Sequence, residues 1–397
     1  MRNAIVSDLC KSLLRPEVTA LPPYDPGADP TAVKAESGVS KVTKLSNNEN
    51  PLGISPLAMA ALAEEICDCG KYPDPAANSL RRALAARLDV PKDRIIIGNG
   101  SENILELLCQ AFLSPGDRVV TQTPRFGLHE IFPMMMGAYV DKVRPRHDFS
   151  FDASAWERAL SSPTKMIMLC NPSNPLGAAL TKDEFRFVMN SAARDVFLVI
   201  DEAYFEFAKG SLSFPDALEE LRAQSRAWMV LRTFSKAYGL AGLRVGYGVA
   251  SHSSVVDALD RVRTPYNVNH LAQRAAIAAL EDEQHLRRTI DLIDAERHYL
   301  NCRLREAGFV VAPSLANFLF VDTGRPSDLV TRELLKDGVI VKGWREIGFE
   351  SFVRVTIGER GDNDMFLEAL ARATARIPQL SWEHDKTAAV EFIGEKV

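Results

Sequence analysis

Short apolar runs bounded by turn residues alternate with amphipathic stretches along most of the chain after Asn47. The runs lie at 94–98, 118–122, 166–170, 196–201, 228–234 and 245–250. Continuous apolar strands separated by helix-forming stretches are typical of a mostly parallel sheet that helices cover on both faces. This pattern predicts an α/β domain as the main part of the protein.

The periodicity changes after this region. Between Glu281 and Gly308, apolar residues recur at steps of three, four and seven, at Leu286, Ile290, Ile293, Leu300 and Leu304. This spacing predicts one long amphipathic helix that stops at the glycine. Four apolar runs follow it, FVV, NFLFVD, GVIVKG and FVRVTIG, and then a helical pattern near 365–375. We therefore expect a smaller α+β domain after the large one.

These patterns divide the chain into four parts. Five prolines among the first thirty residues predict an extended arm, which we place at 1–45. The large domain is expected at 46–280, and the linking helix with the small domain at 281–377. The last part, 378–397, is polar and reads as a loosely attached tail.

Composition excludes several classes of protein. With 397 residues, 46% hydrophobic and 25% charged, the chain has enough apolar material for a large core. A net charge of −5 argues against a protein that coats nucleic acid. No apolar run approaches the roughly 20 residues of a membrane span, so no membrane partner is expected.

The cysteines and the N-terminus point to the cytoplasm. The N-terminal segment is too polar for a secretory signal and carries acidic residues. The six cysteines are scattered, and Cys67 and Cys69 are the only close pair. No histidine cluster completes a zinc site, so we expect reduced structural thiols in a cytoplasmic protein and no metal.

A glycine turn at 98–100 is the first candidate site. The strand before it runs into Gly98 and Gly100, and a helix is expected to start near Ser101. A helix N-terminus that opens from glycines presents free N–H groups and suits a phosphate. A dinucleotide fingerprint would need a third glycine where Asn103 stands, so a single phosphate group fits better. A plain strand-to-helix turn is the alternative.

Two further strands end in groups that carry chemistry. Asp201 follows one apolar strand, and Lys236 follows the next, with Thr233, Ser235 and Arg244 beside it. A lysine among apolar residues at a sheet edge should have a lowered pKa and suits imine formation. Each residue alone also fits a bland role, as a cap or a surface charge. Together, an amine, a carboxylate and a phosphate anchor are what pyridoxal phosphate requires.

The sequence resembles fold-type I pyridoxal-phosphate aminotransferases, most closely the histidinol-phosphate aminotransferase family. The resemblance covers about residues 24 to 370 in the family's order. The matching segments are LSNNENPLG (45–53), KYPDP (71–75), GNGSEN (98–103), NPSNPLG (171–177), DEAY (201–204), RTFSKAYGLAGLR (232–244), PYNVN (265–269) and RVTIG (354–358).

The resemblance implies roles around the cofactor ring. Lys236 would form the imine with the cofactor and then move the proton at the substrate α-carbon. Asp201 would pair with the ring nitrogen. Asn174 and Tyr204 would donate hydrogen bonds to the oxygen of the ring hydroxyl. Phe126 would stack on the ring.

The resemblance also implies a phosphate cup. The backbone N–H groups of Ser101 and Glu102 would bind the phosphate, and Ser235 and Arg244 would complete the cup. Thr233 belongs to the same cofactor-binding group.

The substrate residues implied by the resemblance are fewer. Arg354 would bind the α-carboxylate of glutamate and 2-oxoglutarate, since a guanidinium binds a carboxylate in bidentate fashion. Tyr24 in the arm, position 49 of the NNENP segment (Glu49) and Lys342 are further substrate candidates. Tyr72 would reach the phosphate in the neighbouring subunit, which implies a homodimer.

Three residues depart from the family's pattern. Lys342 stands where the family usually has an arginine for the substrate phosphate. Arg125 and His129 are unexpected beside the stacking ring; Arg125 is a candidate for another anion contact, and His129 fits a structural role better than an acid–base role. These departures bear on the amino donor rather than on the cofactor.

The expected activity is a ping-pong transamination. The favoured reaction converts histidinol phosphate and 2-oxoglutarate to imidazole acetol phosphate and glutamate, in histidine biosynthesis. An aminotransferase for aromatic or other amino acids is the alternative, as is a decarboxylase or other lyase on the same scaffold. A non-catalytic or nucleotide-binding α/β protein is a third class, and it predicts that Lys236 is dispensable for cofactor binding.

Overall fold

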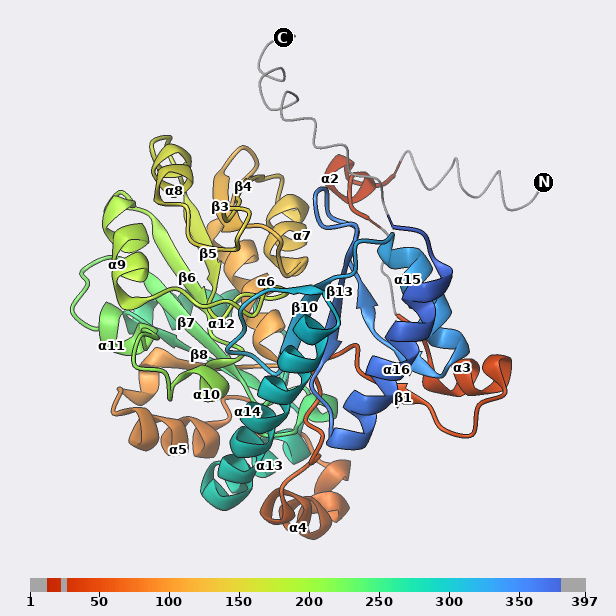
Figure 1. Ribbon diagram of the computed structural model, residues 1–397. Coiled ribbons are helices and arrows are strands. Elements are labelled where there is room, and N and C mark those ends of the chain that lie inside the picture. The colour runs from red at the N-terminus through yellow and green to blue at the C-terminus, as the bar shows by residue number, and fades with distance from the viewer. Residues whose placement is uncertain (1–12, 23–26, 380–397) are drawn as a thin grey trace.

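The computed structural model describes residues 13–22 and 27–379, and its main feature is a seven-stranded sheet (Figure 1). The strand order is β2-β8-β7-β6-β5-β3-β4. Only β8 runs antiparallel to its neighbours, β2 and β7. The strands are β2 Ile95–Gly98, β3 Arg118–Gln122, β4 Tyr139–Val143, β5 Met166–Cys170, β6 Phe197–Asp201, β7 Trp228–Thr233 and β8 Gly246–Ala250. The predicted α/β fold with a mostly parallel sheet is confirmed.

Helices cover both faces of this sheet (Figure 1). The helices of this part are α4 Pro56–Glu65, α5 Asn78–Leu88, α6 Ser101–Phe112, α7 Leu128–Met135, α8 Ala153–Leu160, α9 Lys182–Ser191, α10 Phe205–Ala208, α11 Ala217–Leu221, α12 Ser253–Val262 and α13 His270–Glu281. Short 3-10 helices are η1 Ile66–Gly70, η2 Lys92–Arg94 and η3 Ala241–Leu243.

Side chains of the central strands alternate between two apolar clusters. Ile167 and Leu169 of β5 pack with residues of α5, α9 and α13 on one face. Met166 and Met168 of the same strand pack with α6 and α12 on the other face. Because successive side chains of a strand point to opposite faces, an unbroken apolar run feeds both cores.

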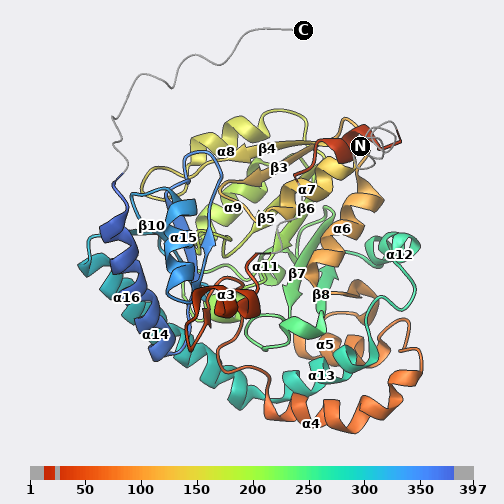
Figure 2. The same cartoon turned by 90° about the vertical axis from the view of Figure 1, so that its right-hand side faces the viewer.

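A four-stranded antiparallel sheet forms the second part of the molecule, in the order β12-β13-β10-β9. Figure 2 shows α14 and α16 on one flank of the molecule, beside this sheet, with α12 on the opposite flank. The elements are α14 Glu283–Glu306, β9 Val310–Val311, β10 Phe318–Asp322, α15 Ser327–Lys336, β11 Val339–Ile340, β12 Lys342–Gly343, β13 Phe352–Thr356 and α16 Arg360–Arg376. The long helix expected between Glu281 and Gly308 is thus confirmed.

The N-terminal segment contacts this second part. It holds α2 Pro16–Thr19, α3 Pro30–Ser37 and β1 Thr43–Lys44. Strand β1 pairs in parallel with β11, so that Thr43 lies opposite Val339. Residues expected to belong to an arm therefore extend the C-terminal part. The boundaries at 45, 280 and 377 stay predictions, and most of the expected tail lies outside the described residues.

One strand of the large sheet was not among the predicted strands. Residues Tyr139–Val143 form β4 at the edge of the large sheet, paired only with β3. Only Val143 of this strand is buried, and Tyr139 is exposed, because an edge strand has one side open to solvent. Within 13–22 and 27–379, no helix has both the length and the apolar character needed to cross a membrane.

Candidate active site

A cavity of about 600 Å³ opens at the carboxyl ends of β5, β6 and β7. Ligands of open α/β sheets bind at this edge. The cavity is lined by Asn47, Asn48, Glu49, Gly100, Ser101, Glu102, Phe126, Cys170, Asn174, Asp201, Ala203, Tyr204, Thr233, Ser235, Lys236, Ala241, Gly242, Arg244 and Arg354. The sheet brings together nearly all the residues expected around the cofactor, although they come from separate segments of the chain.

Lys236 follows β7 and reaches into the cavity. Its Nζ donates a hydrogen bond to the backbone oxygen of Asn47, at 2.9 Å. The pKa of this amine is lowered to about 7, chiefly by burial, and the nearby charge of Arg354 contributes in the same direction. A substantial fraction of the amine is therefore neutral and nucleophilic near neutral pH, as the sequence predicted.

Asp201 ends β6 and is buried. Its Oδ1 accepts a hydrogen bond from the N–H of Ala203 at 3.1 Å, and its Oδ2 lies 3.2 Å from Nε2 of His129. His129 is itself buried on α7, three residues after Phe126 in the sequence. Asp201 therefore has the partners that a buried carboxylate needs. His129 is therefore a hydrogen-bonding partner of the Asp201 carboxylate, a role that its position in the sequence did not reveal.

A chain of polar contacts surrounds the hydroxyl of Tyr204. This oxygen lies 3.0 Å from Nδ2 of Asn48 and 3.2 Å from Nδ2 of Asn174, and it accepts from both amides. Burial raises the pKa of the phenol, so the hydroxyl keeps its proton. With two amide donors on the oxygen, that proton is available to an acceptor in the cavity.

Arg354 closes this chain of contacts from β13. Its Nη1 donates to Oδ1 of Asn174 at 2.7 Å, and its Nη2 donates to the backbone oxygen of Ser46. The guanidinium is buried, and burial lowers its pKa. Its Nε finds no hydrogen-bond partner within the described part of the chain. A buried cation with a spare donor is suited to an incoming carboxylate.

Position 49 needs a correction. Its side chain is the carboxylate of Glu49, which lines the cavity and forms an ion pair with Lys44 at 2.9 Å. A carboxylate cannot donate a hydrogen bond to an anionic substrate. The neighbouring Asn48 instead supplies the amide that reaches Tyr204, and it was missed because adjacent asparagines in NNEN are indistinguishable by pattern.

The N-terminus of α6 forms an anion-binding cup with Arg244. No side chain caps the first turn of this helix. A Cβ at Gly100, where φ is +80°, would lie 2.7 Å from Nη2 of Arg244, and a Cβ at Gly246 would lie 2.4 Å from the backbone nitrogen of Ser101. Glycine adopts the φ of Gly100 without strain, and a Cβ at Gly246 would collide with backbone, so the glycine turn is more than a plain strand-to-helix connection.

The remaining cup residues support one another. Arg244 Nη1 lies 3.4 Å from Ser235 Oγ, and its Nη2 lies 3.0 Å from a carboxylate oxygen of Glu102. Thr233 Oγ1 accepts a hydrogen bond from the N–H of Ser235 at 3.1 Å. Thr233 therefore orients the cup, although it also lines the cavity.

Two expected residues, Tyr72 and Lys342, do not line the cavity. Tyr72 is 81% exposed and stacks on Tyr266, with ring centroids 4.4 Å apart. Lys342 lies directly opposite Arg354 in the register of β12 and β13, so both side chains leave the same face of the sheet. Tyr24 falls outside the described residues.

Arg125 does not offer its charge to a ligand. Its guanidinium forms ion pairs with Glu130 and with Glu346, and Glu346 also accepts hydrogen bonds from Thr123 and from Nε1 of Trp344. The interpretation of Arg125 as an anion contact is therefore not supported. The residue instead links the segment that carries Phe126 to the loop between β12 and β13.

The donor set fits pyridoxal phosphate in each of its parts. The cavity presents an amine, a buried carboxylate, a hydroxyl donor, an aromatic ring and a helix N-terminus with an arginine. These groups match the aldehyde, the ring nitrogen, the ring hydroxyl, the ring face and the phosphate of this cofactor. No cluster of ligands typical of a metal ion lines the cavity among the described residues.

Comparison with known proteins also relates this chain to aminotransferases. The model of the family "Aminotransferase class I and II" matches residues 40–370. The histidinol-phosphate aminotransferase 1 of Mesorhizobium japonicum is 42% identical, over 91% of this chain and 98% of the relative. The histidinol-phosphate aminotransferase of Moorella thermoacetica is 41% identical, over 91% of this chain and 93% of the relative.

A solved structure supports the fold. The histidinol-phosphate aminotransferase from Sinorhizobium meliloti, in complex with pyridoxal 5'-phosphate, superimposes with a TM-score of 0.82 at 26% identity. The match covers 91% of this chain and 97% of that one. The predictions of an aminotransferase and of pyridoxal phosphate as its cofactor are confirmed at the level of the family. The chain belongs to the aminotransferase class I and II family.

Proposed function

We propose that this aminotransferase transfers the amino group of histidinol phosphate to 2-oxoglutarate and forms imidazole acetol phosphate and glutamate, a step of histidine biosynthesis. The observation that carries the proposal is the arrangement of Lys236, Asp201 and the α6 cup in one cavity, with the buried cation of Arg354 beside them. Relatives that are 41% and 42% identical over most of the chain carry this activity in their names.

Pyridoxal phosphate supplies an electron sink for the α-carbon of the bound amine. Lys236 binds the cofactor through its neutral amine and afterwards moves a proton to and from the substrate α-carbon, a task for which a pKa of about 7 is suitable. Asp201, held by His129, keeps a proton on the ring nitrogen. The hydroxyl of Tyr204 donates to the ring oxygen.

Arg354 binds the carboxylate of the acceptor. Within the described part of the chain Arg354 forms no ion pair with a carboxylate, and its Nε is unpartnered. An α-carboxylate would satisfy the charge and accept two parallel hydrogen bonds. Asn174 contacts both Arg354 and Tyr204, so it couples the carboxylate site to the cofactor site.

The donor phosphate is the finer part of the proposal. Lys342 leaves the sheet on the same face as Arg354 and is the basic residue that we assign to this phosphate. Because Arg125 is neutralised by Glu130 and Glu346, the site depends more heavily on Lys342. Because only this one basic residue is assigned to the donor phosphate, a second candidate stays open, namely an amino donor without a phosphate, such as an aromatic amino acid.

We also propose that the enzyme acts as a cytoplasmic homodimer. Exposed apolar side chains cluster in sequence on α4 and η1, at Leu57, Met59 and Ile66, and Tyr72 follows them. A second copy covering this face would remove apolar surface from water and bring Tyr72 to the partner's cofactor.

The decisive experiment compares donors. The purified, cofactor-loaded enzyme receives histidinol phosphate, histidinol or phenylalanine with 2-oxoglutarate, and glutamate formation is measured. We expect kcat/KM for histidinol phosphate to exceed that for histidinol by at least roughly tenfold, because a charge-assisted contact to phosphate is lost. Equal values, or a preference for phenylalanine, would contradict the proposed donor and favour the second candidate.

A covalent map tests the cofactor site itself. Borohydride reduction followed by peptide mapping should find the pyridoxyl group on Lys236. A pyridoxyl group on another lysine, or on none, would refute the proposed site whatever the donor. Conversion of the bound cofactor to its amine form by glutamate would separate a transaminase from a lyase.

A further inference from the structure

The stacked pair of Tyr72 and Tyr266 lies on the surface, away from the cavity. Their ring planes are 20° apart, and the side chains are 81% and 42% exposed. The hydroxyl of Tyr72 makes no hydrogen bond to any described residue. Stacking on a second ring favours one orientation of an exposed aromatic side chain over its other rotamers.

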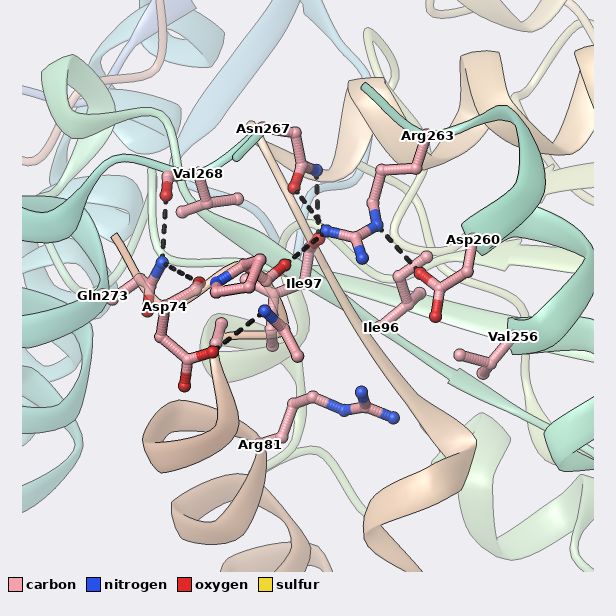
Figure 3. Close-up of a pocket in the computed structure, with 13 residues that line it drawn as sticks. Asp74, Arg81, Ile96, Ile97, Val256, Asp260, Arg263, Asn267, Val268 and Gln273 are labelled. Atoms are coloured by element: carbon pink, nitrogen blue, oxygen red, sulfur yellow. Dashed lines mark hydrogen bonds and ion pairs between the residues drawn. The ribbon is translucent and has the colours of Figure 1, made fainter. Parts of the chain in front are cut away.

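Two braces tie together the loops that carry these tyrosines (Figure 3). Gln273 donates from Nε2 to the backbone oxygens of Asp74 at 3.1 Å and Val268 at 3.0 Å. Arg263 donates from Nη1 to the backbone oxygen of Pro75 at 2.7 Å and to Oδ1 of Asn267 at 3.0 Å. Each brace therefore joins the loop after η1 to the loop before α13.

The braced loops are also tied to the anion cup. Asn267 Nδ2 donates to the backbone oxygen of Ile97 in β2, at 3.3 Å, and to Oδ1 of Asn103 in the first turn of α6, at 3.1 Å. Figure 3 shows Asn267 and Arg263 meeting above β2. The gap between these residues is about 10 Å³, room for one water molecule, so the cluster is a brace and not a ligand site.

The backbone of Tyr266 lies in an unfavourable region. Its φ is +56°, in the left-handed region that residues with a Cβ rarely adopt. Glycine would occupy this position without strain. A strained aromatic residue persists only where the surroundings hold it, and such residues cluster at functional sites. The backbone conformation would favour glycine at this position, so we attribute the presence of a tyrosine to what its side chain contacts.

We propose that Tyr266 is a positioning residue: its ring holds Tyr72 in the orientation in which the Tyr72 hydroxyl reaches the cofactor phosphate in the partner subunit. This inference rests on the proposed homodimer. Tyr72 does not line the cavity of its own chain, and its side chain is largely exposed. Stacking removes the rotational freedom that the ring would otherwise lose on binding, so the contact costs less entropy.

The test measures cofactor affinity instead of activity. Apoenzyme of the wild type, Y72F, Y266F, Y266G and the double variant Y72F/Y266G is titrated with pyridoxal phosphate, and gel filtration confirms that each remains a dimer. We expect Y72F to bind about tenfold more weakly, because a hydrogen bond to a charged group is lost. Y266G should bind roughly three- to tenfold more weakly, and Y266F should bind like the wild type.

The double variant shows whether Tyr266 affects cofactor affinity through Tyr72 or independently of it. If Tyr266 acts through Tyr72, Y72F/Y266G should bind within about twofold of Y72F alone. Multiplied effects, or wild-type affinity in Y266G, would overturn the inference. Y266G also relieves backbone strain, so thermal unfolding no lower than in the wild type would show that the lost affinity is not misfolding.

Cofactor binding, the Tyr72 contact and the role of Tyr266 are each contradicted by a different result. Wild-type protein that binds no pyridoxal phosphate would refute the proposed function. Normal binding with an unaffected Y72F would refute the contact across the subunits, and the role of Tyr266 with it. Normal binding with a weakened Y72F and an unaffected Y266G would refute the role of Tyr266 alone.

Discussion

At the scale of single residues, Lys236 shows how surroundings set reactivity. Burial and the charge of Arg354 both disfavour the protonated amine, while Glu49 acts in the opposite direction. The balance brings the pKa down to about 7 from the ordinary 10.5. The chemistry expected of this lysine thus depends on side chains from two distant segments, one beside β1 and one on β13.

This shift predicts a pH dependence for cofactor binding. The amine attacks only in its neutral form, so the rate at which apoenzyme binds pyridoxal phosphate should rise with pH and reach half of its maximum near pH 7. Stopped-flow absorbance measures this rate. In R354Q the neighbouring positive charge is gone, the pKa of Lys236 should rise, and the midpoint should move to higher pH. An unmoved midpoint would contradict the assigned cause.

The same shift has a consequence for stability. The folded pKa of Lys236 lies below its unfolded value, so the unfolded chain holds more protons between pH 7 and 10.5. The contribution of this group to apoenzyme stability should therefore rise with pH in that window. Urea titrations of the wild type and K236M apoenzymes at several pH values measure it, and parallel curves would contradict the expectation.

A second prediction concerns the residue behind the carboxylate. In H129L, Asp201 loses its Nε2 contact, and we expect kcat for the glutamate half-reaction to fall by roughly tenfold or more, since a hydrogen bond to a charged group is worth about 1.5–3 kcal/mol. H129Q keeps an amide donor and should retain more activity. Equal activity in both variants, with fold intact by circular dichroism, would show that His129 is only structural.

At the scale of elements, the cup depends on the close approach of β8 to the start of α6. In G246A the new Cβ would lie 2.4 Å from the backbone nitrogen of Ser101, which must shift. We expect the affinity for pyridoxal phosphate to drop by more than about tenfold, because the helix N–H groups leave their positions. Fluorescence titration measures the affinity.

A glycine without neighbours is the matched control for that variant. Gly361 lies in α16, and a Cβ there meets nothing within 4 Å. G361A should bind the cofactor like the wild type and gain about 0.5–1 kcal/mol of stability, since alanine favours the helix. If G246A also binds pyridoxal phosphate like the wild type, the absence of a side chain at position 246 is not required for cofactor binding.

At the scale of the whole molecule, Glu346 joins the two sheets. Its carboxylate accepts hydrogen bonds from Thr123 and Arg125, which follow β3, and from Trp344 in its own loop. Both carboxylate and guanidinium are largely buried. Removing one member of such a pair leaves the other poorly satisfied, so the contact should fix the second part of the molecule against the first.

The corresponding prediction uses E346A. We expect the free energy of unfolding to fall by about 3–5 kcal/mol, because Arg125 keeps only Glu130 as a partner in a buried place. Chemical denaturation measures the change. R303A is the control: it breaks the exposed pair of Arg303 with Glu306, and should cost less than about 1 kcal/mol. Similar losses in both variants would contradict the assigned role.

Sequence patterns predicted most of the fold and many residues of the candidate site. The buried strands and α14 were recognisable because their periodicity is local. Lys236, Asp201 and the glycines before α6 were recognisable because chemistry and strand ends coincide. The edge strand β4 was not, since charged residues interrupt its apolar residues and only Val143 is buried. Asn48 and His129 were not, since their partners are distant in the chain and no local pattern identifies them.

By itself, the amino-acid sequence determined which segments become strands and helices and which residues could serve a phosphate, an amine and a carboxylate. These properties follow from side-chain chemistry and from the period of short windows. Only the tertiary structure decided that Arg354 lowers the pKa of Lys236, that Arg125 is paired with two carboxylates, and that Tyr266 stacks on Tyr72. The physical reason is that electrostatic and packing contacts act through space, over a few ångströms, between residues that the chain order keeps far apart.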